Sequence, residues 1–133
     1  EQNVKDAIAK LERDGTIVKY TAVVDWDRAR DGGVTALIEV KISPQRGEGY
    51  DRIAERIYQY DEVESLYLMS GAFDLAVTIR ARTMREVSEF VFAHLAGIDG
   101  VTGTATHFIM KKYKEKHCVF EKTTEQEERG LFV

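Results

Sequence analysis

A short connection between two predicted strands carries side chains suited to holding a small charged molecule. It contains Met69, Ser70, Gly71 and Asp74. The Asp74 carboxylate is a suitable partner for an ammonium group, and the amides around Ser70 and Gly71 are suitable for a carboxylate. An ordinary hairpin turn explains the same residues, because glycine supplies a positive φ and aspartate accepts backbone amides. Whether this connection is only a turn or also a binding site decides the function.

The last predicted strand offers a second set of polar groups. Thr104 and Thr106 point to the same face of that strand because strand side chains alternate. Two hydroxyl groups beside the turn can hydrogen-bond a zwitterion, and the soft side chain of Met69 can line a pocket. Threonine is also a good strand former, so these residues are compatible with a purely structural role.

The remaining reactive side chains do not form a recognisable site. His94, His107 and the pair His117–Cys118 lack the spacing of a closed zinc site, and the chain has a single cysteine. The sequence contains no Gly-x-Ser-x-Gly motif and no nucleophile with an evident base. It therefore predicts no catalytic residue, no metal site and no cofactor, and an enzyme is the least favoured class.

The composition fits one globular domain with a small appendage. Of the 133 residues 44% are hydrophobic, and the formal net charge is −4. A packed core is therefore expected, and the whole chain is too acidic for a simple nucleic-acid binder. The lone Cys118 fits a reducing compartment, and no signal peptide or apolar run of about 18 residues is visible, so we expect a cytoplasmic protein. Because the sequence starts at Glu1 and not at Met, we expect further sequence upstream.

The first part of the chain is predicted to contain a helix, a strand and a linker. Residues 4–14 have apolar side chains at helical spacing, and Gly15 is a suitable end for that helix. Thr16–Asp25 is rich in β-branched residues, which predicts a strand. The polar segment that follows ends at Gly33 and is typical of a linker.

The region from Val34 to Met110 has the pattern of a βαββαβ unit. Alternating apolar residues predict four strands, over 34–42, 63–70, 74–81 and 101–110. Helical periodicity predicts two helices, over 50–58 and 84–95. Thr83 and Glu86 form a capping box at the start of the second helix. This order is that of the ferredoxin-like α+β fold, an antiparallel sheet with two helices on one face.

The face of this sheet opposite the helices is predicted to be partly apolar. Leu37, Leu66 and Leu68 fall out of phase with the buried residues of their strands. A sheet with a second apolar face usually pairs with another copy. The pattern therefore predicts a homodimer formed through the sheets.

The chain from about Val4 to Lys114 resembles the Lrp/AsnC (leucine-responsive, feast/famine) transcription regulators. Residues 4–25 resemble the end of that family's helix-turn-helix domain and its linking strand. The turn from Gly71 to Asp74 resembles the family's Gly-x-x-Asp turn, and residues 100–106 resemble its threonine-bearing final strand. The three motifs occur in order and at suitable spacing.

The resemblance implies four regions. They are a remnant of the helix-turn-helix domain at 1–15, a linking strand and linker at 16–33, an effector-binding and oligomerisation domain at 34–116, and a tail at 117–133. Only the recognition helix of the DNA-binding domain is present. Contacts with DNA through Gln2, Asn3 and Lys5 are therefore implied for the parent protein, and weak or no DNA binding is expected of this chain.

The resemblance also implies an amino-acid effector bound between protomers of a homodimer that assembles further, into a tetramer or an octamer. The expected effector-binding residues are Met69, Ser70, Gly71, Asp74, Thr104 and Thr106. The alternative is a stand-alone small-molecule-binding regulatory domain without DNA-binding activity. The helix at 4–14, followed by Gly15, favours the regulator.

Overall fold

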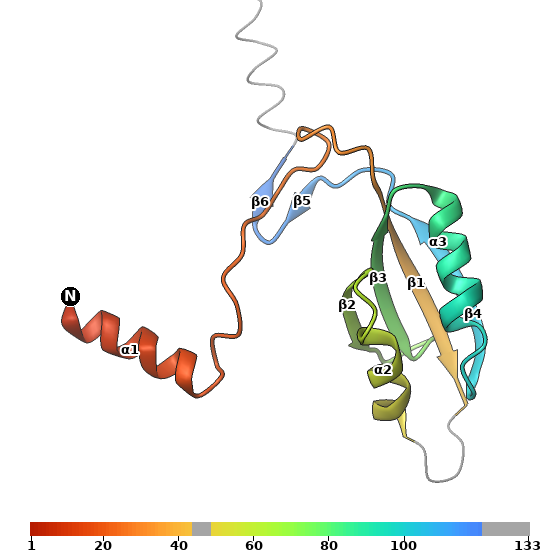
Figure 1. Ribbon diagram of the computed structural model, residues 1–133, viewed down its shortest axis with the longest axis horizontal. Coiled ribbons are helices and arrows are strands. Elements are labelled where there is room, and N and C mark those ends of the chain that lie inside the picture. The colour runs from red at the N-terminus through yellow and green to blue at the C-terminus, as the bar shows by residue number, and fades with distance from the viewer. Residues whose placement is uncertain (44–48, 121–133) are drawn as a thin grey trace, which may run out of the picture. The chain divides into compact units, whose positions relative to one another are not determined.

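The structure is a computed structural model, and it describes residues 1–43 and 49–120. The chain divides into two compact units (Figure 1). One unit is Trp26–Tyr113, and the other combines residues 1–25 with the chain from Lys114 onward. The loop expected around Pro44 and most of the tail predicted at 117–133 lie outside the described residues.

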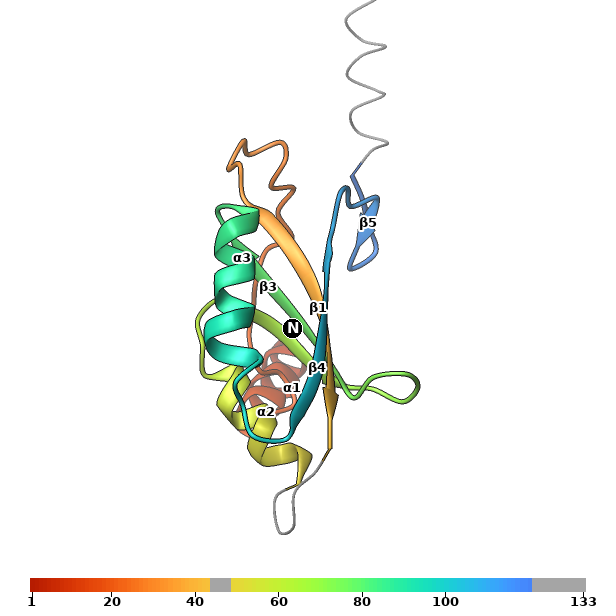
Figure 2. The ribbon, with the colours of Figure 1, turned by 90° about the vertical axis from the view of Figure 1, so that its right-hand side faces the viewer.

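The larger unit contains one four-stranded sheet. Its strands are β1 (Val34–Ile42), β2 (Val63–Leu68), β3 (Leu75–Ala81) and β4 (Val101–Phe108). They lie in the order β2-β3-β1-β4, and every neighbouring pair is antiparallel. The helices α2 (Tyr50–Tyr58) and α3 (Met84–Phe90) lie on the same face of the sheet (Figure 2). The predicted ferredoxin-like βαββαβ fold is confirmed.

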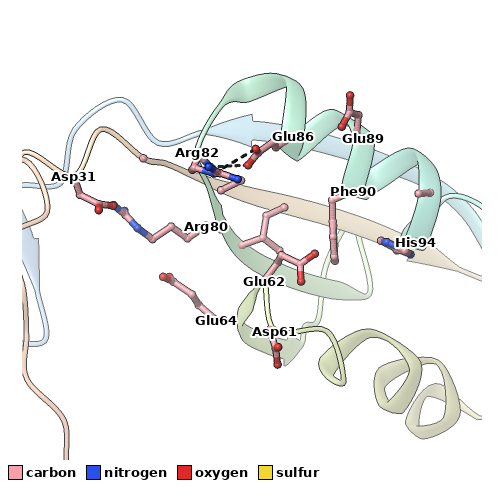
Figure 3. Close-up of a pocket in the computed structure, with 14 residues that line it drawn as sticks. Asp31, Asp61, Glu62, Glu64, Arg80, Arg82, Glu86, Glu89, Phe90 and His94 are labelled. Carbon is pink, nitrogen blue, oxygen red and sulfur yellow. Dashed lines mark hydrogen bonds and ion pairs between the residues drawn. The ribbon is translucent and has the colours of Figure 1, made fainter.

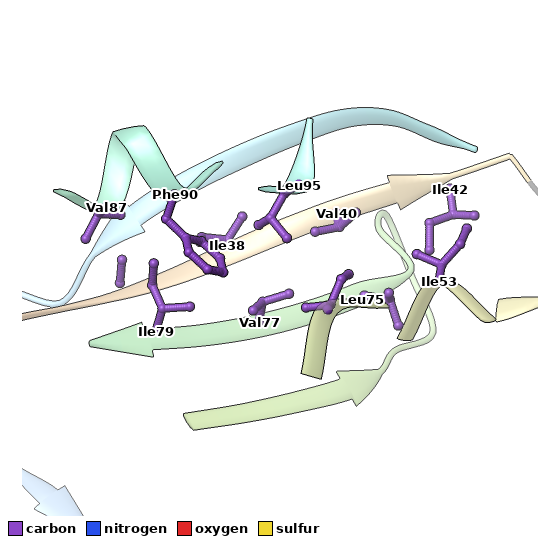
Figure 4. Close-up of a cluster of buried hydrophobic side chains, with 12 residues drawn as sticks. Ile38, Val40, Ile42, Ile53, Leu75, Val77, Ile79, Val87, Phe90 and Leu95 are labelled. Atoms are coloured by element: carbon purple, nitrogen blue, oxygen red, sulfur yellow. The ribbon is translucent and has the colours of Figure 1, made fainter. Parts of the chain in front are cut away.

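The hydrophobic core lies between the sheet and its helices (Figure 4). Alternate residues of the two central strands point into it, because strand side chains alternate between faces. Ile38 and Val40 of β1 are fully buried. The facing residues of β3 and the helices complete the core, and the largest of them that are fully buried are Leu75, Val77, Ile79, Ile57, Val87 and Leu95.

The capping box predicted at the start of α3 is confirmed. The backbone N–H of Glu86 donates to the Thr83 hydroxyl at 3.1 Å. The Glu86 carboxylate in turn accepts from the backbone N–H of Arg82 at 2.9 Å, one residue before the cap. Two backbone donors at the helix N-terminus, which have no partner inside a helix, are thereby satisfied.

We expect Thr83→Ala to lower the free energy of unfolding by about 1 kcal/mol, because it removes the oxygen that accepts the Glu86 amide. Thr102→Ala is the matched control, since Thr102 is an exposed threonine of β4 whose hydroxyl makes only a long 3.4 Å bond to the Lys41 carbonyl. Urea unfolding of both variants and the wild type measures the difference. Equal losses in the two variants would show that the cap adds nothing specific.

The second helix changes its winding before it ends. It continues from α3 into a π-helical turn, η1 (Val91–Leu95), in which the Ala96 N–H donates to the Val91 carbonyl at 2.9 Å. The sequence periodicity predicted one regular helix as far as Leu95. Leu95 is fully buried as expected, but Met84, expected on the same apolar face, is 55% exposed.

The assignment of two leucines to the open face of the sheet was wrong. Leu66 packs against the core, and Leu66 and Leu68 line a cavity of about 410 Å³ with residues of α2, so both lie on the helix side. The cause is an irregularity in the β2–β3 pairing between Val63 and Ser65. An extra residue at such a bulge shifts the alternation by one position. Leu37, in the regular strand β1, does lie on the open face, because its neighbour Ile38 is in the core.

The strand predicted at Thr16–Asp25 does not form among the described residues. Residues 14–17 form a turn and a bend, and residues 18–25 carry no regular structure. A strand exists only where a neighbouring strand accepts its hydrogen bonds, and Val18 remains 89% exposed. The segment is instead attached to the preceding helix, where the Ile17 N–H donates to the Leu11 carbonyl at 3.0 Å.

The smaller unit contains the first helix and a short hairpin. The helix α1 (Gln2–Arg13) confirms the predicted helix, and Gly15 follows with a φ of +83°. The hairpin pairs β5 (Lys114–Glu115) with β6 (Cys118–Val119). Its two turn residues, Lys116 and His117, both have positive φ, as a type I′ turn requires. Among residues 1–43 and 49–120, no helix is long and apolar enough to cross a membrane.

Candidate functional site

The turn between β2 and β3 projects from the sheet on the side away from the helices (Figure 2). It is closed by a hydrogen bond from the Met69 N–H to the Asp74 carbonyl at 2.8 Å. Gly71 has a φ of +119°, a conformation that a residue with a Cβ rarely adopts. Met69, Ser70 and Gly71 are all exposed. The turn therefore presents backbone amides and one hydroxyl to whatever lies beyond the sheet.

Asp74 fastens this turn to the central strand. Its backbone N–H donates to the Val40 carbonyl at 3.0 Å, and its carboxylate accepts from the backbone N–H of Ile42 at 2.7 Å. The pairing of β1 with β4 shifts between Lys41 and Ile42, so the carboxylate satisfies an amide at an irregular point of the sheet. Asp74 therefore has the structural role that the sequence analysis considered, because its carboxylate accepts a hydrogen bond from a backbone amide. A half-buried carboxylate can also accept from an ammonium group, because each oxygen has two lone pairs.

The two threonines lie elsewhere in the single chain. Thr104 and Thr106 share one face of β4, and both are half-buried. They pair in register with Val40 and Ile38, so they point to the helix side of the sheet. The strand β1 separates β4 from β3, which places the threonines roughly 10 Å from the strand that Asp74 precedes.

One chain therefore does not bring the six predicted residues together. None of the six lines the cavities of about 780, 410 and 270 Å³ in the larger unit. The turn residues and Asp74 form one group, and the threonines form a second group. A common site requires residues from another copy of the chain, as the prediction of binding between protomers assumed.

The cavity of about 780 Å³ lies between α3 and the start of β2 (Figure 3). Phe90 and Ile79 supply part of its apolar wall, and Glu62 and Glu64 supply acidic groups. His94 packs on Tyr60, with ring centroids 4.3 Å apart, and borders both this cavity and that of about 270 Å³. The sequence analysis did not identify this cavity, because its lining residues come from four separate segments.

At one end of that cavity lies Arg80, which the sequence analysis also missed. Its guanidinium makes an ion pair with Asp31 and lies over the ring of Trp26, 4.6 Å from the ring centroid. An arginine inside an apolar strand and the chain's single tryptophan inside a polar segment were the available signals.

The residues predicted to contact DNA in the parent protein lie at the start of α1. Gln2, Asn3 and Lys5 are all exposed, and the Gln2 amide donates to Asp6 at 3.1 Å. No residue of α1 is buried in the described structure, and its apolar residues Val4 and Ile8 are 62% and 38% exposed. The helix therefore exposes an apolar stripe in the described structure.

Among the described residues, the pKa values of Asp14 and Tyr20 are displaced, and both groups belong to the segment after α1. Hydrogen bonds from the side chain and the backbone of Thr16 lower the pKa of Asp14. Loss of hydration and a hydrogen bond to Glu12 raise the pKa of Tyr20. Both groups help to attach the segment to the helix end.

Metal ligation finds no support in the described part of the chain. No group of three or more His, Cys, Asp or Glu side chains there is placed to hold a metal ion. His107 is paired with Glu39 at 2.9 Å on the open face of the sheet, and Cys118 is exposed.

A βαββαβ sheet with an exposed polar turn is compatible with many functions, and the comparisons with known proteins define the class. Residues 35–118 match the family described as the Lrp/AsnC ligand binding domain. The chain belongs to the Lrp/AsnC family of transcriptional regulators. It is a regulatory domain and not an enzyme.

Relatives and solved structures agree with this assignment. An uncharacterized HTH-type transcriptional regulator of Bacillus subtilis, YugG, is 53% identical over 120 residues, which are 89% of this chain and 72% of that protein. An HTH-type transcriptional regulator of Pyrococcus horikoshii is 31% identical over 115 residues, 86% of this chain and 73% of that protein.

Two solved structures show the fold. AsnC of Escherichia coli has a TM-score of 0.69 at 15% identity and covers 86% of this chain and 75% of its own. A transcriptional regulator of Neisseria meningitidis, solved in complex with L-methionine, has a TM-score of 0.69 at 22% identity. The match covers 92% of this chain and 78% of that chain. At these identities the likeness concerns the fold alone.

Proposed function

We propose that this chain is the effector-sensing and oligomerisation domain of a DNA-binding transcriptional regulator that responds to a small amino acid. The observation that carries the proposal is the exposed β2–β3 turn, with Ser70 and Gly71 at its tip and Asp74 at its base. The L-methionine complex of the Neisseria meningitidis regulator supports an amino acid as the ligand class. The HTH-type names of the relatives support DNA as the partner of the longer protein.

The proposed ligand contacts divide according to charge. The amides at the turn bind the α-carboxylate, because backbone N–H groups are good donors to anions. The Asp74 carboxylate keeps one oxygen on the Ile42 amide and attracts the α-ammonium. Since Thr104 and Thr106 lie across β1 from the turn, the threonines that reach the ligand belong to another copy.

The proposed dimer forms through the open face of the sheet. That face is marked by Leu37 in the middle and by Tyr67 on the edge strand β2, which is 59% exposed. Ala76 lies on the same face in β3, the strand between β1 and β2. Its small side chain lets a second sheet approach closely. Paired sheets of this kind bury an apolar face that the helices leave uncovered. We also propose that these dimers assemble further, into a tetramer or an octamer.

Titration calorimetry against the twenty amino acids tests the effector proposal. The decisive variant is Asp74→Asn, because its amide oxygen can still accept from Ile42 while the negative charge is lost. A charge-assisted hydrogen bond contributes about 1.5–3 kcal/mol, so we expect the affinity for the amino acid that binds to fall roughly ten- to a hundred-fold. Thr104→Ala is expected to weaken binding in the same direction.

Thr102→Ala is the control for this experiment, because Thr102 lies on the same strand but outside the predicted site. Light scattering on each variant establishes that the oligomer is intact. If no amino acid binds, or if the ligand that binds keeps its full affinity in both Asp74→Asn and Thr104→Ala, the effector site proposed here is wrong and the turn is only structural.

A further inference from the structure

The segment that leads into the sheet folds back on itself before β1 begins. The Asp31 N–H donates to the Trp26 carbonyl at 3.3 Å, and the Arg30 N–H donates to the Asp27 carbonyl at 3.2 Å. Arg30 and Gly32 both have positive φ, at 55° and 72°. These bonds close a turn whose two ends, Trp26 and Asp31, lie next to each other.

Both ends of this turn contact one side chain of the sheet. The Arg80 guanidinium lies 4.6 Å from the centroid of the Trp26 ring and 2.5 Å from the Asp31 carboxylate. It also donates to the Thr35 hydroxyl at 3.5 Å. The Arg80 side chain is only 19% exposed as a result. Figure 3 shows Asp31 and Arg80 pointing toward each other.

Gly33 provides the space for this arrangement. A Cβ at position 33 would lie 2.8 Å from Nη2 of Arg80 and 3.1 Å from the Ala81 carbonyl oxygen. Real Cβ atoms essentially never show a contact of 2.8 Å, and 3.1 Å is tighter than most, so a side chain here would require the guanidinium or the strand to shift. The absence of a side chain at Gly33 therefore leaves room for the Arg80 guanidinium.

We propose that Arg80 is a positioning residue, and that Trp26, Asp31 and Arg80 form a clip that fastens the linker to the sheet. The clip fixes the place where the linker leaves the sheet. Its three contacts are of different kinds: a stacked ring, an ion pair and a hydrogen bond to a buried hydroxyl. Only the planar guanidinium can make all three at once, because lysine has neither the flat face nor the fork of donors. The clip contains none of the proposed effector-binding residues, so its test is independent of the test of the effector site.

A second arginine, just after β3, makes its ion pair with α3 and offers a comparison for Arg80. Arg82 lies two residues further along the chain, its side chain is 90% exposed, and it makes an ion pair with Glu86 in the first turn of α3 at 3.6 Å. Arg82→Gln is therefore a matched control for Arg80→Gln. Both variants remove one guanidinium from the same end of β3.

Trp26 is the only tryptophan of the chain, so its fluorescence reports on the clip directly. Trp26 is 40% exposed when stacked. In Arg80→Gln we expect the acrylamide quenching constant to rise roughly twofold, since loss of the stacked cation frees the ring. Asp31→Asn, a change on the exposed linker side of the clip, is expected to act in the same direction. Arg82→Gln is expected to leave quenching unchanged.

Hydrogen exchange in the same samples separates release of the linker from general loosening. We expect faster exchange of the amides at 27–33 in Arg80→Gln and Asp31→Asn, with unchanged exchange of the β1 amides. Arg80→Lys is expected to behave like Arg80→Gln in quenching, because it restores the charge without the stack. Unchanged quenching and exchange in Asp31→Asn would overturn the proposal, whether or not Arg80→Gln folds. Equal effects of Arg80→Gln and Arg82→Gln would overturn it as well.

Discussion

Replacing Ile38 with alanine is expected to lower the free energy of unfolding by about 2–5 kcal/mol. Ile38 is fully buried in the central strand β1, where it lies in register with Val77 on one side and Thr106 on the other. The loss combines the removal of buried methyl and methylene groups with the cavity that they leave, since a close-packed core relaxes only partly. Small domains have a total stability of about 5–15 kcal/mol, so this one change removes a large share of it.

Urea unfolding followed by circular dichroism measures this effect. Leu68→Ala is the control, because Leu68 also lies on the helix side of the sheet but is 65% exposed, and we expect a loss of about 1 kcal/mol or less. Similar losses in the two variants would mean that Ile38 does not occupy the close-packed centre of the fold.

Much of the fold was predictable because it depends on local patterns. Four runs of alternating residues and two helical faces gave the order βαββαβ, and the spacing of Thr83 and Glu86 located the start of α3 within the correct turn. What could not be predicted depended on pairing between distant segments. The irregularity between Val63 and Ser65 moved Leu66 and Leu68 to the helix side. No alternation within the strand reveals such a bulge.

The segment at Thr16–Asp25 illustrates the same limit. Its β-branched residues describe a preference for extended backbone, but a strand also needs a neighbour. The described structure provides no neighbour for residues 18–25, and the segment is held by the end of α1 through Leu11. Propensity alone cannot specify a partner that lies far along the chain or on another chain.

The candidate site was predictable in its parts and not in its assembly. Gly71 does adopt the positive φ expected of it, and Thr104 and Thr106 do share a face. The sheet order then places β1 between the threonines and β3, so one chain cannot join them to the turn. Arg80 was missed because its partners, Trp26 and Asp31, are about 50 positions away in the sequence and are brought to it by the β1–β3 pairing.

The proposed dimer yields the second large prediction. Leu37→Asp is expected to dissociate the dimer, so that light scattering gives the mass of one chain, 15.1 kDa, in place of the mass of a dimer or of a larger assembly. Leu37 lies on the open face in register with Thr78 and His107, and the new carboxylate adds to the charge of Glu39, two residues along on the same face. In a two-fold symmetric dimer the same surface of both copies forms the interface, so each substituted residue occurs there twice. The substitution therefore places two unpaired charges in the buried interface, at a cost of several kcal/mol each.

Leu68→Asp is the matched control, because it makes the same change on the helix side of the same sheet. We expect it to leave the dimer intact. Tyr67→Asp, on the open face of the edge strand, provides a second disrupting variant if Leu37→Asp reduces the folded fraction seen by circular dichroism. A dimer that survives both open-face variants, or one that dissociates only in Leu68→Asp, would move the interface to the side of the helices. Because the proposed effector site takes residues from more than one copy, a variant that exists as a single chain is also expected to lose amino-acid binding, which links the assembly of this domain to its sensing function.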